Sequence, residues 1–485
     1  MNTSMIRYIL GNILKLQAVF LLLPSATALI YEEDTFVPYI VVAFSCFVLG
    51  YIMTMKKPAD TVFYLKEGCV ATALSWIVLS FSGAFPFVLT GEIPRYIDAL
   101  FETASGFTTT GSSILSNVEA LSRSSLMWRS FSHWVGGMGV LVFLLAVIPM
   151  SGGSNINLMK AESPGPSVGK LVPKIRSTAR ILYMIYIGMG ILMFLLLLCG
   201  KMPVFDALTT TFGTAGTGGF GIKNDSIASY SPYIQWVITI FMLLFGVNFN
   251  AYYLIIFHNV KKAFKIEEVR WYFAIIFLSA FVIFTDLMQF YSSMGDAVRD
   301  SFFQVASIIT TTGFATADFN LWSATSKSTL VLLMFVGACA GSTGGGLKVS
   351  RLIILIKTIF KELTSYTHPK SIVKIKMDDK PIEHEVVRSA NVYFITYMII
   401  FVVSVFCLTF ENIDLISVFT AVAATFNNIG PGLEMVGPTA NFGHFSDFSK
   451  LVMIFDMLAG RLELFPLLML FHPELWKDTI KRKLK

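Results

Sequence analysis

One short pattern occurs four times in this chain of 485 residues. Residues 98–113, 206–221 and 300–315 each begin with an aspartate, and a glycine follows thirteen positions later within a cluster of threonine and glycine. Residues 417–432 form a weaker copy that begins with a serine. Aspartate and serine are common helix N-caps. Each copy therefore predicts a helix of about ten residues followed by a non-helical turn.

The composition places these short helices in a membrane. Hydrophobic residues make up 55% of the chain, charged residues 14%, and the mean hydropathy is +0.68. Apolar runs such as 180–200 and 232–257 are long enough to cross a hydrocarbon core of about 30 Å. A helix of about ten residues rises only about 15 Å, so each of the four is expected to be re-entrant. The turn behind it is tolerated at membrane depth only where it is buried in protein or lines a water-filled path.

Apolar spans flank each short helix, and two further spans, at about 7–30 and 36–55, precede the first. We predict an all-α polytopic membrane protein, in which four pseudo-symmetric helix–pore helix–helix repeats surround one pore, with two extra N-terminal transmembrane helices. The expected units are residues 1–60 for the two N-terminal helices, 61–155 for repeat 1, 156–262 for a cytoplasmic loop and repeat 2, 263–380 for repeat 3 with a broken second helix and a cytoplasmic loop, and 381–485 for repeat 4 with a basic C-terminus.

The net charge of +6 is distributed in a way that predicts topology and no nucleic-acid partner. Lys and Arg gather within 160–180, 261–270, 348–376 and 477–485, together with Lys56–Lys57. By the positive-inside rule these blocks are cytoplasmic, and an even number of spans then places both termini in the cytoplasm. The five cysteines occur singly, so neither a disulfide nor a zinc site is expected, and we expect no cofactor on this chain.

The threonine and glycine turns suit a dehydrated cation. Such an ion needs oxygen ligands in place of its water shell, and converging backbone carbonyls supply them. Glycine permits the backbone conformations that turn successive carbonyls inward. The C-termini of the four short helices would also direct their partial negative ends toward the shared axis. The pattern therefore predicts a cation pathway within one chain.

These stretches resemble those of the Trk/Ktr/HKT superfamily of potassium transporters, and the two extra N-terminal spans make the chain most similar to its TrkH-type members. The resemblance covers essentially the whole chain. It is carried by the turns TTTGSS, GTGGFG, TTTGFAT and NNIGPG, and by SHWVGGMGV (132–140), ESPGPSVGKLVPKIRSTA (162–179) and GRLELFP (460–466).

The resemblance implies a bacterial inner-membrane protein that takes up K⁺ through a selectivity filter, with K⁺ held only by filter oxygens. Glycine at all four filter positions implies potassium selectivity, and the fourth turn, with Asn427 and Pro431, departs most from the pattern. A homodimer is implied, as is a cytoplasmic TrkA-type ring that binds the nucleotide and docks on segments 156–179, 258–268 and 361–384. The implied filter residues are Thr109, Thr110, Gly111, Thr217, Gly218, Gly219, Thr311, Thr312, Gly313, Asn428, Ile429 and Gly430.

A second glycine cluster interrupts the apolar run 332–355. Glycine costs a helix about 1 kcal/mol per residue relative to alanine, so the helix should break here. The break resembles the gating loop of the superfamily, which would block or open the path. Alternatively, it is a kink that relieves close packing. The residues concerned are Gly341, Ser342, Thr343, Gly344, Gly345 and Gly346.

Arg461 lies near the middle of the apolar run 449–472, where a cation costs several kcal/mol and should face the protein interior. The resemblance implies an electrostatic obstacle in the permeation path. The alternative is a staple between repeats, made by a pair with Glu463 or with a pore-helix carbonyl. His133, in the SHWVGG stretch, is expected to pack or to form a hydrogen bond.

The sequence leaves two alternatives to a potassium uptake channel or transporter. A sodium-selective or cation-coupled symporter would have the same fold. A membrane oxidoreductase could use the G-x-G-x-x-G match at Gly216, Gly218 and Gly221, but that motif needs a preceding strand and an acidic residue about twenty positions later. Position 236 is a tryptophan within an apolar segment. We therefore expect a transport protein and no enzyme.

Overall fold

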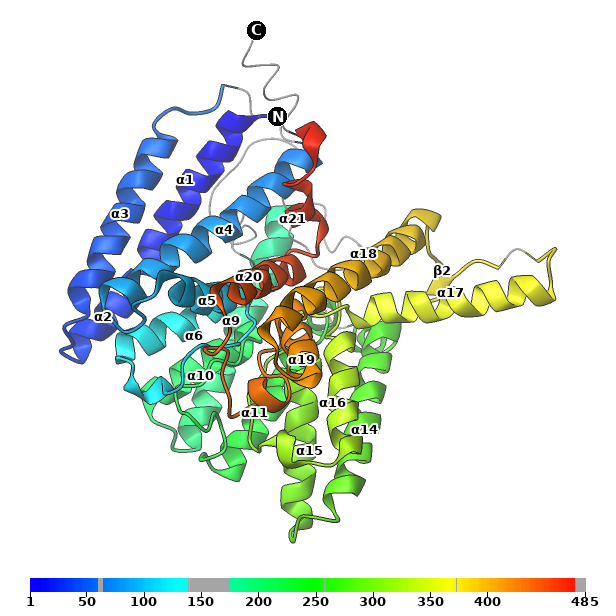
Figure 1. Cartoon of the computed structure of the whole chain (residues 1–485). Coiled ribbons are helices and arrows are strands. Elements are labelled where there is room, and N and C mark those ends of the chain that lie inside the picture. Colours follow the sequence, from blue (N-terminus) through cyan, green and yellow to red (C-terminus); the bar gives the residue numbers. More distant parts are fainter. Residues whose placement is uncertain (60–63, 138, 140–174, 257–258, 372, 476–485) are drawn as a thin grey trace.

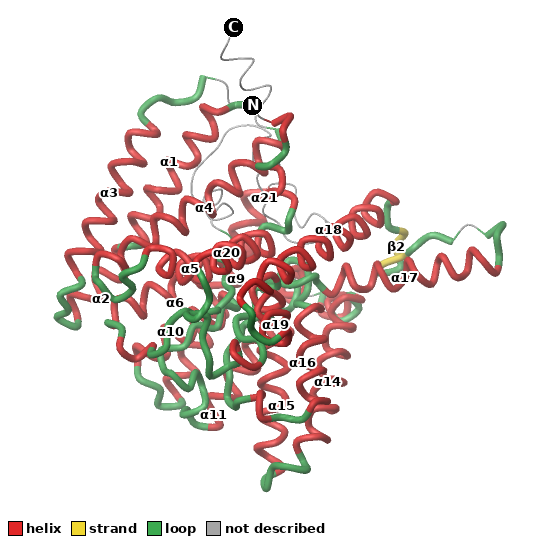
Figure 2. Tube along the Cα trace, viewed as in Figure 1, coloured by secondary structure: helices red, strands yellow, loops and turns green. Residues whose placement is uncertain are grey.

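The computed structural model describes residues 1–59, 64–137, 139, 175–256, 259–371 and 373–475, and these residues are mostly helical (Figures 1 and 2). Three helices come first: α1 (Thr3–Phe20), α2 (Leu22–Ile30) and α3 (Phe36–Thr54). Helices α1 and α3 pack backbone to backbone, because a Cβ on Gly50 would lie only 2.5 Å from the carbonyl oxygen of Gly11. Small residues permit such close approach between helices in lipid.

The four predicted repeats follow in order, which confirms the predicted fold class. Repeat 1 has α4 (Leu65–Leu89), pore helix α5 (Tyr96–Phe107) and α6 (Arg123–Gly137). Repeat 2 has α9 (Ile175–Cys199), pore helix α10 (Val204–Gly216), α11 (Pro232–Phe245) and α12 (Phe249–Ile256). Repeat 3 has α14 (Glu267–Leu287), pore helix α15 (Met294–Ile309), α16 (Ala324–Val336) and α17 (Val349–Thr367). Repeat 4 has α18 (His384–Leu408), pore helix α19 (Leu415–Phe426), α20 (Asp447–Arg461) and α21 (Phe465–Met469).

Short elements connect these helices. Helix α13 (Val260–Ala263) links repeats 2 and 3, and a two-stranded hairpin, β1 (Lys376–Met377) and β2 (Lys380–Pro381), precedes α18. Figure 1 shows that α17, the hairpin and the start of α18 form an arm that projects from the body. Single 3-10 turns are η1 (Val118–Ala120), η2 (Phe319–Leu321), η3 (Thr409–Glu411) and η4 (Glu434–Val436).

The two membrane helices of a repeat differ. Among the described residues, six helices are long and apolar enough to cross a membrane, and they include the first helix of every repeat. The second helices are shorter or broken. Helices α11 and α12 meet at a bend of 92°, and α20 ends at Arg461 before α21 begins. The sequence predicted a break in repeat 3 alone, so the breaks in repeats 2 and 4 correct that expectation.

The predicted N-caps are wrong. Asp98, Asp206 and Ser417 are each the third residue of their pore helix, and Asp300 is the seventh of α15. An acidic side chain in the first turn is favoured by the helix dipole as much as by capping, so composition alone does not separate the two positions. The actual caps are Arg95, Pro203, Ser293 and Asp414, and the helices are 12, 13, 16 and 12 residues long.

Candidate functional site

All four pore helices end in the same hydrogen-bond pattern. The residue two before each filter glycine has positive φ: 56° at Thr109, 53° at Thr217, 57° at Thr311 and 56° at Asn428. The amide of the next residue donates back to the fifth residue before it, which is the Schellman arrangement of a helix C-terminus. These bonds join Thr110 to Ser105 (2.9 Å), Gly218 to Gly213 (2.9 Å), Thr312 to Ser307 (2.8 Å) and Ile429 to Ala424 (2.8 Å).

A second left-handed residue follows in each loop, and this one is the filter glycine. The φ angles are 85° at Gly111, 76° at Gly219, 85° at Gly313 and 105° at Gly430. Each loop therefore has two left-handed residues separated by one. The first is a threonine or asparagine, which costs about 1–2 kcal/mol in this conformation. That cost is offset by the hydrogen bonds of the helix end and by burial of the threonine or asparagine itself, which is fully buried in all four loops.

The four loops meet in a closed ring, in chain order. A Cβ on Gly111 would overlap the carbonyl oxygen of Gly218, one on Gly219 that of Thr312, and one on Gly313 that of Ile429. The ring closes where a Cβ on Gly430 would lie 3.0 Å from the carbonyl oxygen of Thr110. Only glycine permits this spacing between neighbouring loops. The structure thus brings together all four loops that the sequence predicted to form the filter.

Side chains join the fourth loop to the first. Ser112 Oγ donates to the carbonyl of Gly430 at 2.8 Å, and Asn428 Nδ2 donates to Thr110 Oγ1 at 2.8 Å. Asn428 Nδ2 also donates to the carbonyl of Met457 on α20, at 2.9 Å. Asn428 therefore has a bracing role that threonine, with its shorter side chain, does not fill.

The ring has the chemistry of a site for a dehydrated monovalent cation. Backbone carbonyls of four loops converge, the C-termini of four pore helices are nearby, and no acidic side chain belongs to the ring itself. Carbonyl dipoles can replace the hydration shell of such an ion without holding it as tightly as a carboxylate would. An arrangement of this kind favours passage over permanent binding.

A buried ion pair between α5 and α6, which the sequence analysis missed, holds the residues that follow two of the filter glycines. Arg129 Nε of α6 donates to Glu102 Oε1 of α5 at 2.7 Å, and both side chains are almost fully buried. Glu102 also accepts from Ser113 Oγ and from the amide of Ile114, both at 3.0 Å, and Arg129 donates to the carbonyl of Gly221 at 3.1 Å. One ion pair thus fixes the chain beyond the filter glycine in repeats 1 and 2. An arginine in the apolar segment that follows the first filter turn is the signal that could have revealed it.

His133 connects the same two repeats and is a hydrogen-bonding group, as expected. Its Nδ1–H donates to the carbonyl of Gly106 at 2.8 Å, and its Nε2 accepts the amide of Phe220 at 3.2 Å. The ring is fully buried and packs against Phe220. Because one nitrogen donates and the other accepts, these bonds specify the neutral imidazole in a single tautomer.

The second glycine cluster lies directly against the filter loops. Residues 337–348 form an irregular loop between α16 and α17. The amide of Gly345 donates to Thr311 Oγ1 at 2.6 Å. A Cβ on Gly345 would lie 2.6 Å from the carbonyl oxygen of Asn427, and one on Gly344 would lie 2.9 Å from that of Thr310. Thr310 and Asn427 end their pore helices, so the loop covers the helix-terminal side of the ring.

Glu268, in the first turn of α14, closes the neck of this loop. Its Oε1 accepts the amides of Ala340 (2.6 Å) and Ser350 (3.1 Å), which bracket residues 341–349, and its Oε2 accepts Asn248 Nδ2 at 3.3 Å. Asn248 lies in the break between α11 and α12. A single buried carboxylate therefore holds the loop and the helix break of repeat 2 together. This role of Glu268 could not be predicted from the spacing of residues, because its partners are distant along the chain.

Arg461 reaches the same loop from the end of α20. Its guanidinium donates to the carbonyls of Thr343 (2.9 Å) and Gly137 (2.9 Å), and also to that of Gly136. Glu463 forms an ion pair with Arg351 of α17. The alternative predicted from the sequence was a staple to Glu463 or to a pore-helix carbonyl, whereas these three carbonyls belong to the loop and to α6. Lys348 of the loop is also buried and donates to the carbonyl of Gly344.

The dinucleotide interpretation of the glycines fails on this geometry. Gly216 ends pore helix α10, and Gly218 and Gly221 lie in the loop that follows. No strand precedes them in the described part of repeat 2, because α9 and α10 occupy 175–216 with a short turn between them. The motif match is accidental.

Comparisons with known proteins agree with this geometry. The sequence profile of the TrkH family, described as "Cation transport protein", matches residues 39–483. The Trk system potassium uptake protein TrkH of Salmonella typhimurium is 34% identical over 99% of this chain and 100% of its own length. The Trk system potassium uptake protein TrkG of Escherichia coli is 32% identical over 99% of this chain and 100% of its own length. The crystal structure of the potassium transporter TrkH from Vibrio parahaemolyticus superposes with a TM-score of 0.88 at 32% identity, over 98% of this chain and 100% of that one.

Four pore helices whose loops close into one ring define a polytopic membrane transport protein with a single central path. Within that class, the chain belongs to the TrkH family of cation transport proteins.

Proposed function

We propose that this chain is a potassium-selective uptake channel or transporter of the bacterial inner membrane. The observation that carries the proposal is the closed ring of four loops, in which each filter glycine packs against a carbonyl of the next repeat. Dehydrated K⁺ would pass through this ring, with the carbonyls of Thr110, Gly218, Thr312 and Ile429 as its ligands. The names of the relatives, which are potassium uptake proteins, support K⁺ as the transported ion.

The gate in this proposal is the loop at residues 341–346, acting with Arg461. The loop covers the ring, contacts two of its four filter loops, and offers its Thr343 carbonyl to Arg461. A loop of glycines held by a few hydrogen bonds can leave this position at modest cost. Arg461 adds a positive charge on the path that K⁺ would take beyond the ring, and such a charge opposes a cation.

The basic segments support a cytoplasmic face and a partner on it. The segment 361–384, apart from residue 372, which lies outside the described residues, comprises the end of α17, the hairpin and the first residue of α18 on the projecting arm (Figure 1). It contains Lys361, Lys370 and Lys374. A TrkA-type ring that binds the nucleotide is the proposed partner, and it would reach the gate through α17, which begins directly after the loop. The residues up to 174 in the first predicted docking segment, and 258 in the second, lie outside the described residues. Both termini are proposed to be cytoplasmic, and a homodimer is the proposed assembly.

Uptake by purified protein in liposomes tests the function. We expect ⁸⁶Rb⁺ or K⁺ to enter in response to an imposed membrane potential without a proton or sodium gradient, and excess Na⁺ to compete weakly. Empty liposomes and vesicles loaded without a potential are the controls. Uptake that requires a proton or sodium gradient would instead establish the symporter alternative, and equal uptake of Na⁺ would overturn potassium selectivity.

A further inference from the structure

One carboxyl in the membrane interior lacks the partners that the other buried acids have. Asp456 lies in the middle of α20 and is fully buried. Ser404 Oγ of α18 donates to its Oδ1 at 2.7 Å. Its Oδ2 has no hydrogen-bond partner within the described part of the chain, and no described Lys or Arg forms an ion pair with it.

The other buried acids near the pore show what an ionised carboxylate requires here. Glu102 pairs with Arg129 and Glu268 accepts three N–H donors, and even the half-buried Glu463 pairs with Arg351. Each has a cation or several donors, as a buried charge must if it is not to be strongly destabilising. A charged Asp456 would have one hydroxyl donor and no counter-ion. A neutral carboxyl at the same place needs far less stabilisation.

We propose that Asp456 is a proton-binding site inside the membrane, with the proton carried on Oδ2. The step is a simple association, in which the carboxylate takes H⁺ from water and returns it, and no other bond forms or breaks. This site lies outside the ring and the gate loop, and the inference does not depend on the identity of the transported ion.

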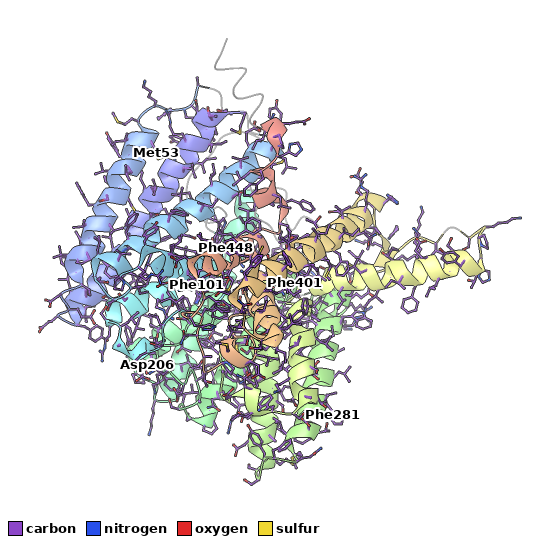
Figure 3. All side chains as sticks on the ribbon, viewed as in Figure 1. Met53, Phe101, Asp206, Phe281, Phe401 and Phe448 are labelled. Carbon is purple, nitrogen blue, oxygen red and sulfur yellow. The ribbon has the colours of Figure 1, made fainter. Side chains whose placement is uncertain are left out.

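Among the described residues, no ionisable side chain on the helices packed against α20 forms an ion pair with Asp456. An apolar groove between α18 and α20 passes the site, with Ser404, Val403, Val452 and Phe455 in its lining. Phe401 and Phe448 mark these two helices in Figure 3. Helix α19 and helix α21 have no ionisable side chain, and those on the other packed helices are at helix ends or paired elsewhere. They are Lys66, Glu67 and Cys69 of α4, Tyr96, Asp98 and Glu102 of α5, His384, Glu385, Arg388, Tyr393, Tyr397 and Cys407 of α18, and Asp447, Lys450 and Arg461 of α20.

The proton would matter for the ring because the same two helices hold the fourth filter loop. The carbonyl of Met457, the residue after Asp456, accepts Asn428 Nδ2. Seven residues before Ser404, on the same face of α18, Tyr397 donates from its hydroxyl to Asn427 Oδ1 at 2.9 Å. The Asp456–Ser404 hydrogen bond thus ties together the two helices that brace this loop. Loss of the proton would place a charge between them and loosen both braces.

Infrared difference spectroscopy of the protein in liposomes tests the site directly. We expect a carboxylic acid C=O absorption at neutral pH that is absent from Asp456→Asn. The matched control is Asp447→Asn, on the first turn of the same helix, where the carboxylate pairs with Arg95 near the surface; it should leave the band unchanged. Should the asparagine variant fail to fold, Ser404→Ala should shift the band, because its hydrogen bond is lost. If the band persists in a folded Asp456→Asn protein, or does not shift in Ser404→Ala, the proposal is overturned.

Selectivity gives the functional readout. In the parent protein, the ratio of K⁺ to Na⁺ uptake should fall at alkaline pH by about fivefold, the effect of losing one hydrogen bond of ordinary strength. In Asp456→Asn, the ratio of K⁺ to Na⁺ uptake at alkaline pH should equal its value at neutral pH. A ratio that falls equally in both proteins overturns the coupling. Failure of uptake in the parent protein at every pH would count against the proposed function and leave the infrared result untouched.

Discussion

Glycine has different structural roles in the filter ring and in the loop at 341–346. In the filter ring, each glycine lies where a Cβ would meet a backbone carbonyl of the neighbouring repeat, and each has positive φ. In the loop at 341–346, Gly344 and Gly345 also approach carbonyls, but the loop is fixed mainly by three side chains from outside it: Thr311 of the third filter loop, Glu268 of α14 and Arg461 of α20. Neighbouring loops of the ring pack backbone against backbone, with side chains such as Asn428 and Ser112 as further braces, whereas the loop at 341–346 is held mainly by side chains from outside it.

This difference teaches where each element can move. In the ring, each loop packs against the backbone of the next, so the loss of one side-chain contact loosens a loop without releasing it. A loop held by three side chains can be released by any change that moves one of them, such as a shift of α14 or α20. In the proposed function, selection belongs to the ring and gating to the loop, so changes in the ring and changes in the side chains that hold the loop are expected to have effects of opposite sign.

Gly313→Ala should have the largest effect, a loss of uptake of about 100-fold. The new Cβ would overlap the carbonyl of Ile429 and take a left-handed conformation, which together cost about 3 kcal/mol. A difference of about 1.4 kcal/mol is tenfold in rate. The control is Gly188→Ala on α9, where a Cβ meets nothing within 4 Å. Normal uptake by Gly313→Ala would break the assignment of selection to the ring.

Gly430→Ala should lose less, about tenfold, because its Cβ would lie 3.0 Å from the Thr110 carbonyl and the other three overlap theirs. K⁺ and Na⁺ uptake measured side by side will show whether the fourth loop also contributes less to selectivity. Equal losses in Gly430→Ala and Gly313→Ala would mean that all four loops are equally constrained.

Arg461→Ala should raise K⁺ flux about fivefold, in contrast to the ring variants. The change removes a positive charge whose repulsion of a passing cation is about 1 kcal/mol, and it frees the Thr343 carbonyl. The control is Arg95→Ala, whose side chain is 61% exposed. Unchanged or reduced flux in a well-folded Arg461→Ala protein would show a purely structural role.

Glu268→Gln should raise flux by a smaller factor, about two- to threefold, because an amide replaces only part of the hydrogen bonding at the neck of the loop. A thiol reagent applied to Ser342→Cys should react faster in this background. The matched control is Glu267→Gln, the preceding residue, which pairs with Lys357 at 2.5 Å. If both variants behave alike, the neck is not what holds the loop.

Much of the fold could be predicted from local patterns. Apolar length identified the N-terminal spans and the first helix of every repeat, and the thirteen-residue spacing identified four pore helices and their turns. The starts of those helices were misplaced, because an aspartate at the third position looks like an N-cap in the sequence. The breaks in repeats 2 and 4 were missed as well. At Gly246 and after Arg461 there is no dense glycine cluster, and the helices break because other repeats contact them there.

The sequence by itself determined the membrane class, the count of repeats and the residues of the four turns, because each depends on short-range chemistry that composition and spacing record. Tertiary structure alone decided which turn faces which, how Arg129 and Glu102 pair, and how Glu268, Arg461 and Asp456 lie around the pore. Those contacts join residues tens to hundreds of positions apart. Their partners become neighbours only when four repeats close around one axis, and no local pattern encodes that closure.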